Sequence, residues 1–361
     1  MYTRFESIGT YLPPTAVSSA HIVGALARPL PLDLAALTGI AERRVRDRRP
    51  GTGEDSLALA VRAALDCLAS SRHRAEDLDV VISASITRYR GERMQWEPAL
   101  ALEVCREIGA VRALYFDVSN ACAGMMTGVS VLDHLIRSGQ VRNGLVVSGE
   151  CATTVAETAQ REITGLRDPR LASLTVGDAG AAVVMDLAEP GAPDRVHYAQ
   201  LMTSARFARL CTARPSDLAP GMTMHTDSAE LHGNDVVGQW PALYRNLLDR
   251  LGLAFDDERF DFLIPHQVSS GFVERVRQAG ERELGPMPPM LTVLDRYGNT
   301  ASTSLFVTLH DHLRGRAGTG PAKYLVVVSA SGVVMGVVSV TVSPAAVRAG
   351  LAGATGAAVV V

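Results

Sequence analysis

The chain has 361 residues, which is long enough to bury a sizeable core and suggests about two domains. Aromatic residues make up only 5% while Gly, Ala and Val are abundant, which favours an α/β protein over a β-sandwich. A net charge of −3 without a long basic stripe argues against a nucleic-acid partner. Five scattered cysteines do not form a disulfide framework, which points to a reducing, cytoplasmic setting.

The first segments carry no targeting signal, because residues 1–14 lack the apolar core of a signal peptide. A basic run follows at residues 43–49, with the sequence RRVRDRR. It is typical of a solvated loop, and the alternative is contact with phosphates or an acidic carrier protein. On that alternative, Arg43 and Arg44 contact the substrate.

The chain repeats itself loosely at half its length. A charged turn followed by a buried strand occurs around Asp79 and again around Asp261. Val-rich strands around Val146 and Val327 recur at nearly the same offset. Two matches at one offset predict two similar halves, residues 1–190 and residues 191–343.

Each half also contains a polar turn that opens a helix. In the first half the sequence NACAG at residues 120–124 precedes apolar residues at helical spacing over 125–137. In the second half YGNTA at 297–301 precedes leucines four residues apart. We therefore expect Cys122 and Asn299 at the N-termini of two central helices that lie near each other.

The longest uncharged stretch, residues 324–346, has the length of a membrane span. Serines and glycines interrupt it and valines dominate it, so two buried strands around a turn, with no membrane span, are the better interpretation. Residues 344–361 are rich in Ala, Gly and Val without clear periodicity, which indicates an extension or flexible tail.

Cys122 has the setting of a nucleophile. A thiol at a helix N-terminus faces unpaired N–H groups and the positive end of the helix dipole, and both lower its pKa. The same N–H groups can stabilise the oxyanion that forms when a thioester carbonyl is attacked. The alternative is a small buried hydrophobic residue, which the NACAG sequence disfavours.

His266 and Asn299 complete a set of reactive groups. His266 follows the apolar strand FLIP, and α/β proteins place catalytic groups at such strand ends. A neutral imidazole there can donate to a thioester oxygen or accept a proton. The amide of Asn299 can donate a second hydrogen bond to an enolate oxygen, and its alternative role is plain N-capping.

Sequence patterns for metals or nucleotides are absent. There is no CxxC, no HExxH and no Gly-rich loop followed by Lys-Ser/Thr, so we expect neither metal nor cofactor. The glycines of GDAGA at residues 177–181 lack dinucleotide spacing and predict a tight turn before a strand. Met125 and Met202 are candidates for lining an adaptable acyl tunnel, with core packing as the alternative.

These motifs together resemble the ketoacyl-ACP synthase III group of the thiolase superfamily over roughly residues 5–343. The resemblance rests on GTYLP, TGIAER, DVSNACAG, TVGDAGA, IPHQ, YGNT and the closing Ser331-Gly332, in that order. It implies a five-layered αβαβα fold of two pseudo-repeated halves, a homodimer, and a catalytic triad of Cys122, His266 and Asn299. It also implies an oxyanion hole made by the backbone N–H groups of Cys122 and Ser331.

One departure from the family pattern points to a subgroup. The family has an apolar residue about 25 positions before the cysteine, where this chain has Glu97. The head-to-head acyl-CoA condensing enzymes of olefin and β-lactone synthesis look similar and place a glutamate there. In such an enzyme the glutamate reaches across the dimer and removes the α-proton of a second acyl thioester. The alternative is that Glu97 is a surface residue near a helix start.

The sequence therefore predicts an acyltransferase that forms a carbon–carbon bond by Claisen condensation of acyl-CoA or acyl-ACP thioesters through an acyl-Cys122 intermediate. We expect a condensation without loss of CO₂. A decarboxylative route with a malonyl extender and acyl transfer to an alcohol or amine stay open as alternatives. A papain-like hydrolase and a non-catalytic scaffold subunit are weaker ones.

Overall fold

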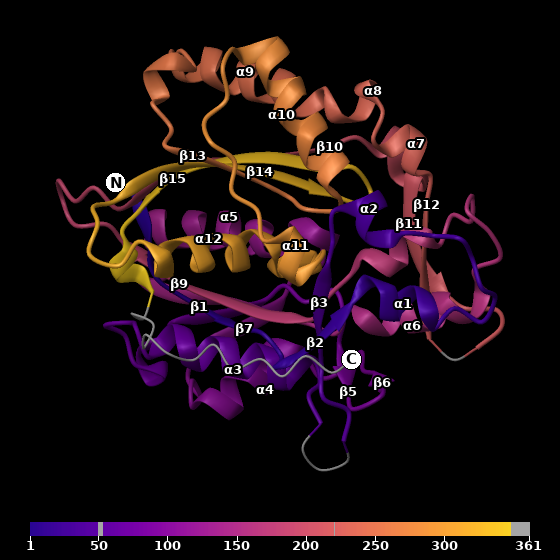
Figure 1. The fold of residues 1–361 in the computed structure, drawn as a ribbon. Helices are drawn as coiled ribbons and strands as arrows, with labels where there is room; N and C mark the ends of the chain where they lie inside the picture. The colour runs from indigo at the N-terminus through magenta and orange to yellow at the C-terminus, as the bar shows by residue number, and fades with distance from the viewer. Residues whose placement is uncertain (50–52, 220, 348–361) are drawn as a thin grey trace.

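A computed structural model describes residues 1–49, 53–219 and 221–347, and most of its strands form two sheets (Figure 1). In the first sheet β9 runs antiparallel to β1 and β8, whereas β8, β4 and β7 are parallel. The strand order in this sheet is β1 (Thr3–Tyr11), β9 (Ala179–Leu187), β8 (Asn143–Glu150), β4 (Val80–Ser83) and β7 (Leu114–Asp117).

The second sheet repeats this arrangement with strands from the later part of the chain. Its order is β10 (Arg195–Thr203), β15 (Val334–Val342), β14 (Ala322–Ala330) and β13 (Phe262–Pro265). β15 is antiparallel to both neighbours, and β14 is parallel to β13. The predicted pair of similar halves is therefore present, while the boundaries at residues 190 and 191 stay a prediction.

The long uncharged stretch near the C-terminus forms the antiparallel pair β14 and β15, as predicted. Every residue of β15 except Thr341 is buried, which explains the run of valines without charge. No helix in the described part of the chain is long and apolar enough to cross a membrane.

Helices cover both sheets and separate them (Figure 1). The two central helices, α5 (Gly124–Arg137) and α12 (Ser304–Gly315), lie side by side between the sheets. The outer face of the first sheet carries α3 (Ser56–Leu68) and α4 (Leu100–Ile108). The outer face of the second carries α9 (Gln239–Leu251) and α10 (Ser270–Leu284). The expected five-layered αβαβα fold is confirmed.

The largest core lies between the two sheets. Met125, Val129, Leu132 and Ile136 of α5 recur at helical spacing and are all buried there, together with Leu309 of α12. Each such side chain stabilises the fold by roughly 1.5–3 kcal/mol relative to an exposed position. This shared core fixes the two central helices, and with them the turns at their N-termini.

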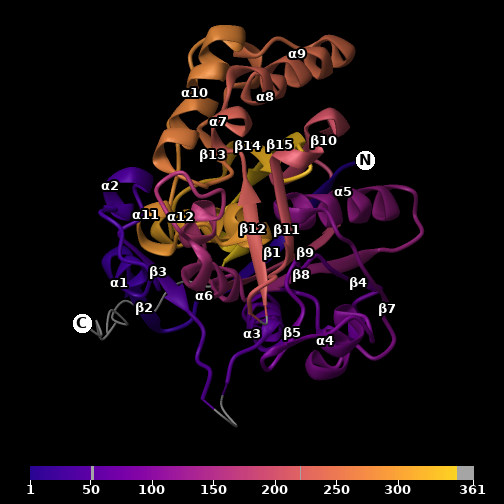
Figure 2. The same ribbon diagram turned by 90° about the vertical axis from the view of Figure 1, so that its right-hand side faces the viewer.

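Smaller elements surround this frame. Figure 2 shows the two-stranded sheet of β11 (Cys211–Pro215) and β12 (Met222–Thr226) in the centre of the view, and β12 contacts α6 (Thr153–Glu162). The remaining pairs and short helices are β2 (Thr15–Ser18) with β3 (Glu42–Val45), β5 (Tyr89–Arg90) with β6 (Arg93–Met94), α1 (Ser19–Gly24), α2 (Leu34–Thr38), α7 (Ser228–Leu231), α8 (Asn234–Val237) and α11 (Leu294–Tyr297). Of the predicted tail, residues 344–361, the first part forms the short helix η7 (Pro344–Ala346), and Ala346 and Val347 are buried in the core between the sheets. From residue 348 onward the predicted tail lies outside the described residues.

Candidate active site

Cys122 lies in a short 3-10 turn, η2 (Ala121–Ala123), that leads directly into α5. Ala121 adopts a left-handed backbone with φ of 47°. A Cβ at Gly124 would come within 2.7 Å of the carbonyl oxygen of Ala84, so only glycine allows the helix to start this close to the neighbouring loop. The turn thus places a half-buried thiol at the N-terminus of a central helix, as predicted.

The predicted low pKa of Cys122 is wrong for the chain on its own. Burial raises the pKa of the thiol well above its usual range, and Cys211 and the carboxyl group of Glu150 raise it further. Desolvation by the surrounding protein outweighs the stabilising backbone hydrogen bond at the helix start. The thiol is therefore protonated at neutral pH, and its attack on a carbonyl requires a proton acceptor.

His266 directly follows β13, and its backbone N–H donates to the carbonyl oxygen of Val327 in β14 at 2.9 Å. The side chain is buried, and burial lowers its pKa to about 4. The imidazole is therefore neutral at pH 7, with one N–H donor and one acceptor nitrogen. Gln267 holds this segment in place, since its amide oxygen accepts from the Val293 N–H at 2.9 Å.

Asn299 is held by its backbone on both sides. Its N–H donates to the carbonyl oxygen of Thr175 at 2.9 Å, and its carbonyl accepts from Gly177 at 3.0 Å. The side-chain Oδ1 accepts from the Ala301 N–H at 3.0 Å. Because the oxygen of the amide is engaged in this turn, the NH₂ group is the part of the side chain left to act as a donor.

The structure brings the segments of these three residues together. The turn of Cys122 contacts η6 (Ala301–Thr303), which directly follows Thr300 and opens α12. The same turn contacts β14, to which the backbone of His266 is hydrogen-bonded. The site therefore contains a thiol, a neutral imidazole and an amide donor from three distant parts of the sequence.

Two further residues near Cys122 were missed from the sequence. Glu150 ends β8, is completely buried, and accepts a hydrogen bond from Ser302 of η6. Cys211 begins β11 and has Thr226 and Ser331 as hydrogen-bond partners. No local pattern marks Cys211, since its neighbourhood forms only through the tertiary fold.

Ser331 begins the turn between β14 and β15, in which Gly332 and Val333 have φ of 76° and 50°. Its hydrogen bond to Cys211, and the position of Cys211 beside Cys122, tie this turn to the thiol. An oxyanion hole that includes the Ser331 N–H stays a prediction.

Glu97 is not one of the buried groups of this cluster. Its side chain is exposed, and it stands three residues before the start of α4. The adjacent Trp96 is 78% exposed, an unusual position for a large aromatic side chain. A catalytic role of Glu97, in a neighbouring subunit, stays a prediction.

Residues 116–203, which include the turn of Cys122, match the family model of 3-oxoacyl-[acyl-carrier-protein (ACP)] synthase III. The beta-ketoacyl-[acyl-carrier-protein] synthase III of Acidiphilium cryptum is 28% identical over 342 residues, covering 91% of this chain and 95% of that protein. Synthase III 1 of Bacillus cereus is 28% identical over 325 residues, covering 88% and 92%. The chain is similar to ketoacyl-ACP synthase III over most of its length. It is thus a condensing acyltransferase at the family level.

Solved structures agree with this fold. Synthase III (FabH) from Pseudomonas aeruginosa superposes with a TM-score of 0.77 and 22% identity, over 95% of this chain and 99% of that chain. OleA from Xanthomonas campestris, solved with bound lauric acid and lauroyl-CoA, gives a TM-score of 0.79 and 22% identity over 95% and 99%. At this identity both comparisons concern the fold.

Within the synthase III-like fold, the predicted phosphate contact at Arg43 is wrong. Its side chain is fully buried and donates to Ser19 at 3.1 Å and to the Leu174 carbonyl at 3.2 Å, so it cannot meet a ligand from solvent. Arg44 is partly exposed, donates to the Pro14 carbonyl at 3.0 Å and lies over the Tyr297 ring. Both side chains hold neighbouring backbone segments in place through these hydrogen bonds.

The two predicted tunnel methionines lie in different cores. Met125 has no exposed surface and packs between the sheets, so core packing, its alternative role, is what the structure shows. Met202 is half-buried in β10, opposite Met335 of β15, and packs at the core under α9 and α10. A tunnel role for Met202 stays a prediction.

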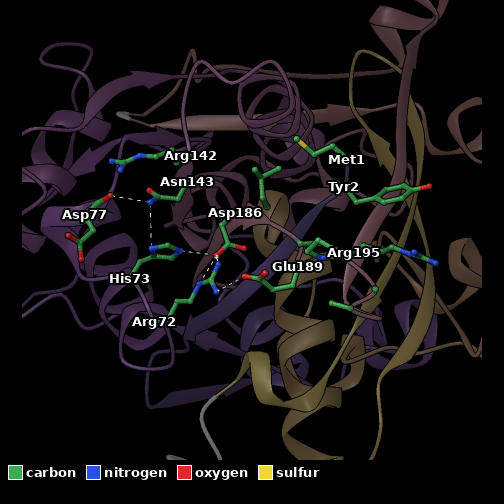
Figure 3. Close-up of a pocket in the computed structure, with 15 residues that line it drawn as sticks. Met1, Tyr2, Arg72, His73, Asp77, Arg142, Asn143, Asp186, Glu189 and Arg195 are labelled. Atoms are coloured by element: carbon green, nitrogen blue, oxygen red, sulfur yellow. Dashed lines mark hydrogen bonds and ion pairs between the residues drawn. The ribbon is translucent and has the colours of Figure 1, made fainter.

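A hollow of about 910 Å³ lies at the other end of the first sheet (Figure 3). It is lined by Asn143, which begins β8, whereas Glu150 at the opposite end of that strand is near Cys122. Some of its charges pair with one another, as Asp186 accepts from Arg72 at 3.0 Å and bonds His73 at 2.8 Å. The described residues contain no group of three or more His, Cys, Asp or Glu placed to hold a metal.

Proposed function

We propose that this chain condenses two acyl thioesters head to head into a β-ketoacyl thioester, through an acyl group carried on Cys122. The observation that supports condensation, as opposed to hydrolysis, is the side chain of Asn299, whose oxygen is engaged by the Ala301 N–H at 3.0 Å. Together with the neutral His266 it offers two donors to a developing enolate oxygen. Two donors suit carbanion chemistry better than hydrolysis or transfer to an alcohol.

In the first half-reaction Cys122 attacks the carbonyl of an acyl thioester. The neutral imidazole of His266 is the acceptor for the thiol proton, because burial keeps the thiol protonated and the imidazole uncharged. The N–H groups at the start of α5 stabilise the oxyanion. The carbon–sulfur bond of the substrate then breaks, the released thiol carrier takes a proton, and the acyl group remains on Cys122.

In the second half-reaction another acyl thioester binds with its carbonyl oxygen between His266 and Asn299. A base removes the α-proton, the carbanion attacks the acyl carbonyl, and the sulfur of Cys122 leaves. Glu150, the carboxyl group beside Cys122, is occupied by hydrogen bonds and fully buried, so it is unsuited as this base. We therefore assign the base to Glu97 of a second copy.

An exposed sheet edge supports this dimer. β7 is at the end of the first sheet, and Leu114 and Tyr115 on it are 57% and 43% exposed. Open strands with apolar side chains are typical pairing surfaces. Asp117 at the end of β7 accepts from the Leu100 N–H at 3.0 Å, which places the start of α4, and Glu97 shortly before it, at the same edge.

The alternative is decarboxylative condensation, in which a malonyl thioester loses CO₂ and no base is needed. The curated relatives at 28% identity are named beta-ketoacyl-ACP synthase III. For this reason condensation with a malonyl extender on an acyl carrier protein is the second candidate reaction. His266 and Asn299 would stabilise the enolate on either route.

Mass spectrometry of the products separates the two routes. The protein is incubated with acyl-CoA alone, and then with added malonyl-CoA or malonyl-ACP. A β-keto product from acyl-CoA alone is the expected result, whereas a product only with the malonyl thioester rejects the role of Glu97. Cys122→Ala should abolish the acyl-enzyme, with Cys105→Ala as the matched control.

A further inference from the structure

The buried carboxyl group of Glu150 has an unusual number of hydrogen-bond donors around it. Its Oε1 accepts from the Ile86 N–H at 2.9 Å, from the Ser148 hydroxyl at 3.1 Å and from the Ser302 hydroxyl. Its Oε2 accepts from the Thr87 N–H at 3.0 Å and from the Thr87 hydroxyl at 2.8 Å. All five donors are hydroxyl or backbone groups, with no cationic partner among them, so the carboxyl group acts here as a hydrogen-bond centre.

These donors belong to three segments that meet at the site. Ile86 and Thr87 continue the loop after β4, whose Ala84 carbonyl oxygen lies against Gly124 at the start of the Cys122 helix. Ser148 is on β8 in the first half of the chain. Ser302 is on η6, two residues after Thr300, and belongs to the turn that carries Asn299. Glu150 thus connects the loop that packs against the start of the Cys122 helix to the turn that carries Asn299.

We propose that Glu150 is a positioning residue that fixes the Asn299 turn against the Cys122 turn through Ser302. The link between the halves rests on this hydroxyl, since the other four donors come from the first half. Loss of a charge-assisted hydrogen bond inside a dry site costs more than loss of an exposed one, because the carboxylate cannot recruit water. The consequence for catalysis rests on the proposed function, in which Asn299 acts only in condensation.

Two serine variants distinguish the link from Glu150 to the Asn299 turn from the other hydrogen bonds of Glu150. Ser302→Ala removes the link to the Asn299 turn. Ser148→Ala removes a first-half hydroxyl from the same oxygen of Glu150, together with its 2.8 Å contact with the Ser302 hydroxyl, but leaves the hydrogen bond from Ser302 to Glu150 in place. Both side chains are buried and both changes delete one oxygen, so their general effects on folding are matched. Glu150→Gln is a second test of the link, since it replaces one acceptor oxygen by a donor.

Two readouts are measured on the full chain. Hydrogen exchange reports the rigidity of residues 297–304 directly, and single-turnover kinetics report acylation of Cys122 and condensation separately. For Ser302→Ala we expect exchange in this segment to rise and condensation to slow by about tenfold or more, with acylation within about threefold of wild type. For Ser148→Ala we expect both rates and the exchange of this segment to stay within about threefold.

The outcomes are distinct. Equal changes in the two serine variants, or equal slowing of acylation and condensation in Ser302→Ala, overturn the positioning role. A wild-type chain that forms the acyl-enzyme but condenses neither with acyl-CoA nor with malonyl thioesters contradicts the proposed function. In that case hydrogen exchange in residues 297–304 still decides whether Glu150 holds the Asn299 turn.

Discussion

Ala121 and Ala301 occupy matching places in the two halves, and both adopt a left-handed backbone, with φ of 47° and 54°. Each begins a 3-10 turn that continues into a central helix. One directly precedes Cys122, and the N–H of the other binds the side chain of Asn299. A left-handed alanine costs roughly 1–2 kcal/mol, so the surrounding structure enforces this geometry at both turns.

This relationship predicts how stability responds to substitution at Ala121. Ala121→Val should lower the free energy of unfolding by about 2 kcal/mol, because a β-branched residue tolerates positive φ poorly. Ala121→Gly should stay within about 1 kcal/mol of wild type, since relief of strain and loss of chain entropy oppose each other. Urea unfolding of both variants measures the difference. Equal losses in the two would assign the effect to side-chain packing.

The assignment of Glu97 to the neighbouring subunit predicts complementation. Glu97→Gln and Cys122→Ala should each abolish head-to-head condensation alone, and Glu97→Gln should still form the acyl-enzyme. Co-expression of the two variants should restore about a quarter of wild-type activity, because half of the dimers are mixed and each mixed dimer has one complete site. A base acting within its own subunit would leave the mixture inactive, which mass spectrometry of the product detects.

The carboxyl group of Glu150 and the thiol of Cys211 both raise the pKa of Cys122. Removing the negative charge in Glu150→Gln should therefore shift the alkylation of Cys122 by iodoacetamide to lower pH, by about one unit. The rate is followed on the Cys122 peptide between about pH 6 and pH 10. Ser148→Ala is the control, because it alters the same network without changing its charge. An unchanged profile would mean that Glu150 is uncharged beside the thiol, as burial raises its own pKa.

His266 predicts a loss of stability in acid. Burial lowers its pKa from 6.5 to about 4, so the unfolded chain binds one more proton between these values. Stability should therefore fall as the pH drops from about 6.5 to about 4, by on the order of 3 kcal/mol from this residue. His197 and His232 have pKa values lowered to about 4 by burial as well, so the comparison must be made between variants.

In His266→Gln the acid-induced decrease in the free energy of unfolding should be smaller than in wild type by that amount. The measurement is urea unfolding at several pH values, with His134→Gln as the control because His134 is exposed. Identical pH dependence in His266→Gln and wild type would show that the imidazole gains a compensating partner in the folded chain.

The sequence by itself determined the architecture and the position of the reactive groups along it. The apolar spacing of Met125, Val129 and Leu132 predicts the central helix, and the interrupted run of valines predicts the pair β14 and β15. These features are readable because helix and strand periodicity, glycine and strand ends are local properties of the chain. The polar turns at Cys122 and Asn299 could be predicted for the same reason, because they too are local features of the chain.

Only the tertiary structure decided the electrostatic state and the exposure of these groups. The pKa of Cys122 depends on its burial and on the neighbouring Glu150 and Cys211. Arg43, which belongs to a basic run in the sequence, is fully buried in the fold. The link from Ser302 to Glu150 joins residues in different halves of the chain. Desolvation and charge interactions depend on which distant groups become neighbours, and a sequence contains no local pattern for that.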